Sequence, residues 1–192
     1  IRTDWNAPNY RVMTASLDKP QREHWTEFIP ESNDVLKSFS GLGGHFYATY
    51  QHKAATRIDV YLPDGKQLQT LQLPAIGSGS VSGHWSHPEV YLRFQSFAHP
   101  SETYSYDVSS NSTQLLKKSS MDIDTSNVSV SQVFYPSKDG EQISMFVLRP
   151  KDIPQDQPIP FLLTGYGGFN ISMLPRFSTR NIVWLEAGGG IA

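Results

Sequence analysis

The chain has 192 residues and a net charge of −2, and 38% of its residues are hydrophobic, 12% aromatic and 18% charged. This composition excludes a disordered chain, which would combine few aromatic residues with a high net charge. The nearly balanced charge excludes the basic surface typical of nucleic-acid or anionic-membrane binding, and the absence of cysteine excludes disulfides and thiolate chemistry.

Residues 1 to about 120 form a pattern of short alternating strands, separated by turn sequences such as PDGK and SSNS. Two complete sets of strands are predicted, and residues 10–29 hold the last two strands of an earlier set. The strands of the complete sets are residues 34–39, 45–52, 57–62 and 67–73, followed by 81–85, 89–97, 102–108 and 113–118. The glycine-serine stretch GSGSVSG, residues 77–83, is assigned to a turn.

The strands recur at a regular period. Equivalent third strands begin at Tyr10, Arg57 and Thr103, which lie 47 and then 46 residues apart. A period of roughly 40–50 residues with about four strands per unit is typical of a β-propeller blade. A stack of generic hairpins is the alternative, but it does not account for the constant spacing. We therefore predict a mostly β chain that begins with about two and a half blades of a partial propeller.

The pattern changes after residue 125. A hairpin that turns at SKDG ends at Pro150, and residues 159–164 (IPFLLT) are apolar without alternation, as expected of a strand buried on both faces. The stretch STRNIVWLEAGGG predicts a helix that Ser178 caps and Gly188 ends. Its predicted apolar side consists of Ile182, Val183, Leu185 and Ala187. A further strand is predicted to begin at GGIA.

Strand, glycine loop, helix and strand in this order are typical of an α/β sheet. We therefore divide the chain into two parts: residues 1–122 are the C-terminal part of a propeller, and residues 123–192 are the first elements of an α/β domain. The chain opens without methionine and stops in the middle of an element, so we expect it to be a piece of a longer polypeptide.

The glycine-rich run LLTGYGGFN, residues 162–170, follows the predicted buried strand. It does not fit a phosphate-binding loop, because no Lys-Ser or Lys-Thr follows its last glycine, and a dinucleotide fingerprint would need a small residue at position 170. α/β-Hydrolases take one oxyanion-hole donor from a glycine-rich loop at this position, since glycine lets the backbone approach a substrate closely. The hydroxyl of Tyr166 could donate there as well. A tyrosine that only packs on a tight turn is the alternative.

Two stretches resemble the prolyl oligopeptidase family of serine peptidases in their residues, their order and their spacing. They are the hairpin QVFYPSKDGEQISMFVLRP and the loop GYGGFNIS. The stretch APNYRV near the start is similar to the propeller of the same family, so the resemblance spans essentially the whole chain. The related oligopeptidase B group has a loop closer to GYGSYG, and Gly168, Phe169 and Asn170 therefore favour the prolyl branch.

The resemblance implies an α/β-hydrolase domain, capped by a propeller that excludes folded proteins, in an enzyme that cleaves short peptides on the carboxyl side of proline. It implies a catalytic role for Tyr166, whose hydroxyl would donate to the oxyanion. It also implies a substrate-binding role for Phe169, which would line the pocket for the proline side chain. The chain contains no G-x-S-x-G motif, and the catalytic Ser, Asp and His would follow Ile191, outside this sequence. We therefore expect the fragment alone to be inactive.

Two other functions stay open at this point: an oligopeptidase B-like peptidase specific for basic residues, and a non-catalytic propeller that binds a protein partner. No cofactor or metal is expected, because the histidines lack H-x-x-x-H or H-E-x-x-H spacing. The expected partners are short proline-containing peptides, with no nucleic acid and no membrane, since no apolar run reaches the roughly 18 residues of a membrane span. We expect the full enzyme to be a monomer. Its expected location is the cytoplasm, with the periplasm or secretion as alternatives.

Overall fold

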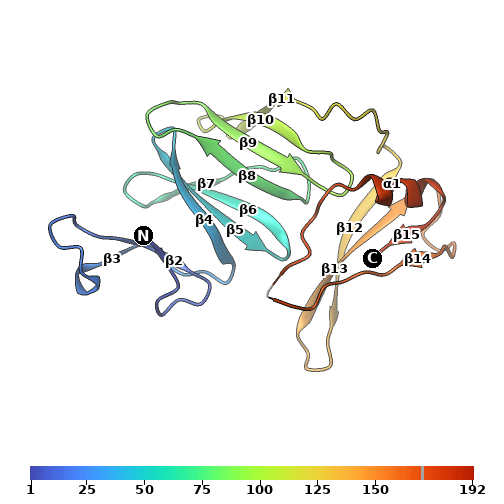
Figure 1. Ribbon diagram of the computed structural model, residues 1–192, viewed down its shortest axis with the longest axis horizontal. Coiled ribbons are helices and arrows are strands. Elements are labelled where there is room, and N and C mark those ends of the chain that lie inside the picture. The colour runs from blue at the N-terminus through green and yellow to red at the C-terminus, as the bar shows by residue number, and fades with distance from the viewer. Residues whose placement is uncertain (170) are drawn as a thin grey trace.

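The computed structural model describes residues 1–169 and 171–192, and it shows three antiparallel sheets followed by a mixed one (Figure 1). A three-stranded sheet, β1-β2-β3, is followed by two four-stranded sheets in the orders β4-β5-β6-β7 and β11-β10-β9-β8. A short 3-10 helix precedes β3. The bounds of these elements are Arg2–Thr3 (β1), Arg11–Thr14 (β2), Arg22–His24 (η1), Thr26–Ile29 (β3), Val35–Leu42 (β4), His45–His52 (β5), Ala55–Tyr61 (β6), Gln67–Thr70 (β7), Ser78–Gly83 (β8), Val90–Gln95 (β9), Glu102–Asp107 (β10) and Ser112–Lys117 (β11).

The two four-stranded sheets confirm the predicted blades, and the chain is mostly β as predicted. β5 has the predicted bounds. In β9 the buried residues Val90, Leu92 and Phe94 alternate with the exposed Tyr91 and Arg93, which is the period-2 pattern on which the prediction depends. Consecutive strands within each sheet are hydrogen-bonded neighbours, as in a propeller blade.

Within the three antiparallel sheets, β1 and β8 differ most from the prediction. β1 is missing from it, because a strand of two residues is too short to show any alternation. The stretch GSGSVSG was wrongly assigned to a turn. β8 begins at Ser78 and pairs with β9 over its whole length, from Ser78 opposite Gln95 to Gly83 opposite Val90. The strand predicted at residues 81–85 therefore starts too late. Glycine is depleted in strands, so the glycine residues at the start of β8 favour a turn when the sequence is considered alone.

The largest core cluster lies between the two four-stranded sheets. Its members are Leu42, Tyr47, Ile58, Val60, Leu71, Val90, Leu92, Phe94 and Tyr106. Phe94 of β9 is completely buried, and its ring packs against the backbone of Gly77, immediately before β8. A methyl group on Gly77 would lie 2.4 Å from a carbon of the Phe94 ring and 2.5 Å from the carbonyl oxygen of Gln95. Glycine at this position therefore lets β8 approach the core.

We expect Gly77→Ala to lower the free energy of unfolding of the propeller by about 1–3 kcal/mol, because the added methyl must displace a buried ring or the backbone. Gly79→Ala is the matched control, since its methyl would lie 3.4 Å from its nearest neighbours, an ordinary contact. Its expected effect is within about 0.5 kcal/mol. Urea denaturation of both variants measures the difference, and equal losses would contradict this packing.

The mixed sheet has the order β12-β13-β15-β14. Its elements are Val128–Pro136 (β12), Gln142–Pro150 (β13), Phe161–Leu162 (β14), Thr179–Glu186 (α1) and Gly190–Ile191 (β15). β12 and β13 form the predicted hairpin, with Gly140 in the left-handed conformation (φ 90°) that its turn requires. β14 runs parallel to β15, and α1 connects them. The predicted strand, loop, helix and strand are thus confirmed.

The helix begins at the predicted N-cap, Ser178, but the side chain of this serine makes no capping hydrogen bond. Its end is as predicted: Gly188 has φ 85°, and the amides of Gly188 and Gly189 donate to the carbonyls of Leu185 and Trp184. These two bonds are those of a Schellman motif, which favours glycine. The predicted apolar side was too wide, because only Ile182 and Leu185 are buried, while Val183 and Ala187 are exposed.

The strand predicted over residues 159–164 was too long and is not buried on both faces. β14 has two residues and is the edge strand of its sheet, so Phe161 and Leu162 are 43% and 54% exposed. The sheet contacts the preceding blade through the rings of Phe97 and Phe146, whose centroids lie 5.1 Å apart. None of the helices in the described ranges has the length and apolar character needed to cross a membrane.

Candidate substrate-binding loop

The glycine-rich loop leaves the carboxyl end of β14. The amide of Thr164 donates to the carbonyl of Ala192 over 2.8 Å, and the amide of Ala192 donates to the carbonyl of Leu162 over 3.0 Å. These bonds extend the parallel pairing of β14 and β15 up to the first residue of the loop. The carboxyl ends of parallel strands are where α/β sheets bind their ligands. The loop is therefore in a position typical of a substrate site.

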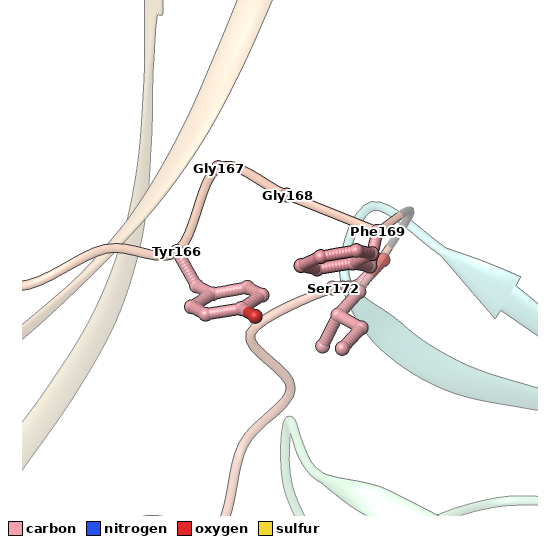
Figure 2. Close-up of a pocket in the computed structure, with 6 residues that line it drawn as sticks. Tyr166, Gly167, Gly168, Phe169 and Ser172 are labelled. Atoms are coloured by element: carbon pink, nitrogen blue, oxygen red, sulfur yellow. The ribbon is translucent and has the colours of Figure 1, made fainter.

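Tyr166 and Phe169 lie together at this loop, as Figure 2 shows. Both rings lie below the arc formed by Gly167 and Gly168, and they line a hollow of about 410 Å³. The other lining residues include Ser172. Tyr166 is 51% exposed and Phe169 is 90% exposed, so neither ring is committed to the protein core.

The backbone of the loop is open to an external group. A methyl group added at Gly165 or Gly167 would meet no described residue within 4 Å. Internal packing thus gives no reason for glycine at these two positions, whereas a substrate close to the backbone would give one. Asn170, the last residue of the GYGGFN motif, lies outside the described residues.

Phe169 has a strained backbone. Its φ is 54°, which is unusual for a bulky side chain and costs about 1–2 kcal/mol. The turn is closed by a hydrogen bond from the amide of Ile171 to the carbonyl of Gly168, 3.1 Å long. Such strain is characteristic of ligand-binding and catalytic positions, where the surrounding structure maintains it. In this loop it places the Phe169 ring on the same side as that of Tyr166.

Two residues of the propeller sheets contact the segment that follows the loop. Gln51 of β5 donates its amide Nε2 to Oγ of Ser172 over 2.8 Å, and Oγ of Ser78 donates to the carbonyl of Pro175 over 2.8 Å. Sequence reasoning missed these contacts, because they join residues 121 and 97 positions apart. No local motif marks either partner.

The histidines show no metal site. His52 bonds to the carboxylate of Asp34 at 2.9 Å, and the rings of His84 and His87 lie 5.1 Å apart. In residues 1–169 and 171–192 no group of three or more His, Cys, Asp or Glu side chains could hold a metal ion.

Comparisons with known proteins agree with the fold described above. The family model for the prolyl oligopeptidase N-terminal β-propeller domain matches residues 1–119. A prolyl endopeptidase from Elizabethkingia miricola is 34% identical over 190 residues, which are 98% of this chain and 27% of that protein. A solved structure from a study of two prolyl endopeptidases and their inter-domain dynamics superposes with a TM-score of 0.89 at 38% identity, over 99% of this chain and 28% of that one.

A more distant structure shares the fold. Oligopeptidase B from Trypanosoma brucei has a TM-score of 0.83 at 20% identity, and the match covers 100% of this chain and 29% of that one. The chain thus spans between a quarter and a third of the length of the proteins it resembles.

Proposed function

The chain belongs to the prolyl oligopeptidase family, and on this premise we propose that it is the part of a serine peptidase that carries an oxyanion-hole donor and one wall of the substrate pocket. The parent enzyme would hydrolyse short peptides after proline. One observation carries the proposal: the Tyr166 hydroxyl and the Phe169 ring line the same exposed hollow at the carboxyl end of a parallel strand. Tyr166 and Phe169, the two proposed site residues, both belong to this loop.

Tyr166 is proposed as the donor to the oxyanion. When a serine attacks a peptide carbonyl, the oxygen acquires negative charge, and a hydrogen-bond donor already in place lowers the energy of that intermediate. A half-exposed phenol beside an open glycine backbone satisfies this requirement, because its hydroxyl can donate and a substrate can reach it.

Phe169 is proposed as a wall of the pocket for the proline ring. Its side chain is 90% exposed, so a bound peptide would bury apolar surface on it. The left-handed backbone holds the ring over the hollow rather than in the core. The catalytic Ser, Asp and His are proposed to lie outside these 192 residues, which contain no G-x-S-x-G motif.

Hydrolysis of two matched substrates by the full-length protein tests this function. The substrates are short peptide amides that release the same chromophore after proline or after arginine. We expect kcat/KM to be at least about 100-fold higher for proline, since a pocket built for one side chain discriminates strongly against a long charged one.

Each alternative has its own outcome in the same assay. A preference for arginine would replace the proposal with an oligopeptidase B-like activity, whose fold this chain also resembles. Cleavage of neither substrate would favour a propeller that only binds a partner. A variant of the full-length protein without its catalytic serine is the control for contaminating peptidases.

A further inference from the structure

Hydrogen bonds connect the two ends of the glycine loop to different parts of the molecule. At its start, the amide of Thr164 donates a hydrogen bond to the carbonyl of Ala192, next to β15. Beyond its end, Ser172 accepts a hydrogen bond from Gln51, and Pro175 accepts one from Ser78, both 2.8 Å long. Figure 1 shows this segment running along the propeller sheets before it returns to α1. The loop thus connects the mixed sheet to the propeller.

The contact at Pro175 involves a buried residue. Pro175 is among the side chains that are less than 2% exposed, although Met173 and Leu174 before it are exposed. Ser78 donates to its carbonyl from the first residue of β8. Gly77, whose lack of a side chain lets β8 approach Phe94, directly precedes this serine. A hydrogen bond from the propeller therefore holds a buried residue of this segment.

The two contacts lie on neighbouring sheets, and hydrogen bonds join the sheets that carry Gln51 and Ser78. The amide of Thr56 in β6 donates to the carbonyl of Gly77 over 3.0 Å, and Oγ1 of Thr56 accepts from the amide of Gly79 over 3.1 Å. Gln51 pairs with the same threonine across β5 and β6. Thr56 therefore connects the strand that carries Gln51 to the strand that carries Ser78.

A third contact joins the same region to the hairpin. The side-chain amide of Gln132 in β12 donates to the carbonyl of Lys53 over 2.5 Å, and the Lys53 ammonium lies 5.3 Å from the centre of the Phe134 ring. Lys53 and Ala54 form the turn between β5 and β6, and both have positive φ, 46° and 61°. This turn and Gln51 thus contact the C-terminal part of the chain together.

The loop itself has few other supports. Tyr166 and Phe169 are exposed, and methyl groups at Gly165 and Gly167 would meet no described residue within 4 Å. Ser172, which Gln51 contacts, lines the same hollow as the two aromatic rings. The position of the Tyr166 hydroxyl therefore depends on where the two ends of the loop are held.

We propose that Gln51 and Ser78 are positioning residues for the reaction: from the propeller, they hold the loop so that Tyr166 points at the oxyanion. The proposal rests on the proposed role of Tyr166. The propeller would then contribute to the value of kcat, in addition to excluding large substrates as the family resemblance implies. Neither residue touches the substrate, and both act through the segment from Ser172 to Pro175.

The test uses Gln51→Leu, Ser78→Ala and the double variant of the full-length enzyme. Each single variant is expected to lower kcat for the proline substrate about three- to tenfold, the scale of one lost hydrogen bond and a small misplacement. KM is expected to change by less than about twofold, because Tyr166 acts in the transition state. Hydrogen–deuterium exchange at residues 164–175 is expected to become faster.

The matched controls are Gln67→Leu and Ser80→Ala, exposed residues of β7 and β8. Neither is expected to change kcat or exchange at the loop. The double variant is also made in the Tyr166→Phe background, where a positioning role predicts little further loss of kcat, because the group being positioned is gone. The same fractional loss in both backgrounds would overturn the proposal.

The exchange measurement separates this proposal from the proposed function, because it requires no catalysis. If the parent protein cleaves neither substrate, the proposed function fails, and exchange still decides whether the propeller holds the loop. Unchanged exchange at residues 164–175 in the double variant would overturn the positioning role. So would faster exchange with an unchanged kcat.

Discussion

Replacing Tyr166 by phenylalanine in the full-length peptidase is expected to lower kcat by about 10²–10³-fold, which is the usual loss for one oxyanion-hole donor. The hydroxyl donates most strongly when the carbonyl oxygen becomes negative, so the effect belongs to the transition state. KM for a short proline substrate is expected to stay within about twofold, since the aromatic ring remains. Steady-state kinetics over a range of substrate concentrations separates the two constants.

The control for this variant is Tyr135→Phe, which removes the hydroxyl of another half-exposed tyrosine, on β12. It is expected to leave both constants unchanged. Because Tyr166 is 51% exposed and lies outside the core clusters, neither variant is expected to change the unfolding temperature. A Tyr166→Phe enzyme with wild-type kcat would remove this residue from the mechanism.

Arg57→Met is expected to destabilise the propeller by about 3 kcal/mol. The guanidinium contacts the carboxylate of Asp34 and lies 3.2 Å from that of Asp59, and it stacks over the ring of Tyr50 at 4.5 Å. Asp59 is only 3% exposed, and its carboxylate also accepts a hydrogen bond from the hydroxyl of Thr70 over 2.8 Å. Removal of the arginine leaves a buried carboxylate without its cation, which is strongly destabilising.

Arg11→Met is the matched control. Arg11 pairs with a single carboxylate, that of Glu27, at 3.2 Å, and the glutamate side chain is 47% exposed. An exposed pair of this kind contributes at most about 1 kcal/mol, because water solvates the remaining charge. Urea denaturation of the two variants measures the difference. Equal losses would show that the burial of Asp59 does not make the contribution of Arg57 larger.

The propeller strands could be predicted wherever apolar residues alternate. Val90, Leu92 and Phe94 reveal β9 because one face of the strand is buried and the other exposed. The first half of β8 could not be recognised in this way, because residues 78–80 are serine and glycine and show no alternation of apolar side chains. The close approach of Gly77, just before β8, to the ring of Phe94 is visible only in the folded structure. The left-handed position of Gly188 was predictable, since few other residues adopt that conformation at a helix end.

The candidate site was predictable only in part, because the sequence places Tyr166 and Phe169 in one short loop. Their common hollow and the positive φ of Phe169 come from the fold. Gln51 and Ser78 could not be predicted, since nothing near either residue in the sequence indicates a contact with Ser172 or Pro175. Such contacts depend on how the propeller and the mixed sheet pack.

The most direct test of the central claim is the affinity of a short peptide aldehyde ending in proline for the full-length enzyme and its Tyr166→Phe variant. A catalytic serine adds to the aldehyde and produces an oxygen at the place of the oxyanion, so the adduct resembles the transition state. We expect the inhibition constant to rise about 100-fold in the variant, while that of the corresponding alcohol changes less than about twofold. Equal affinity of both enzymes for the aldehyde would contradict the assignment of Tyr166 to the oxyanion hole.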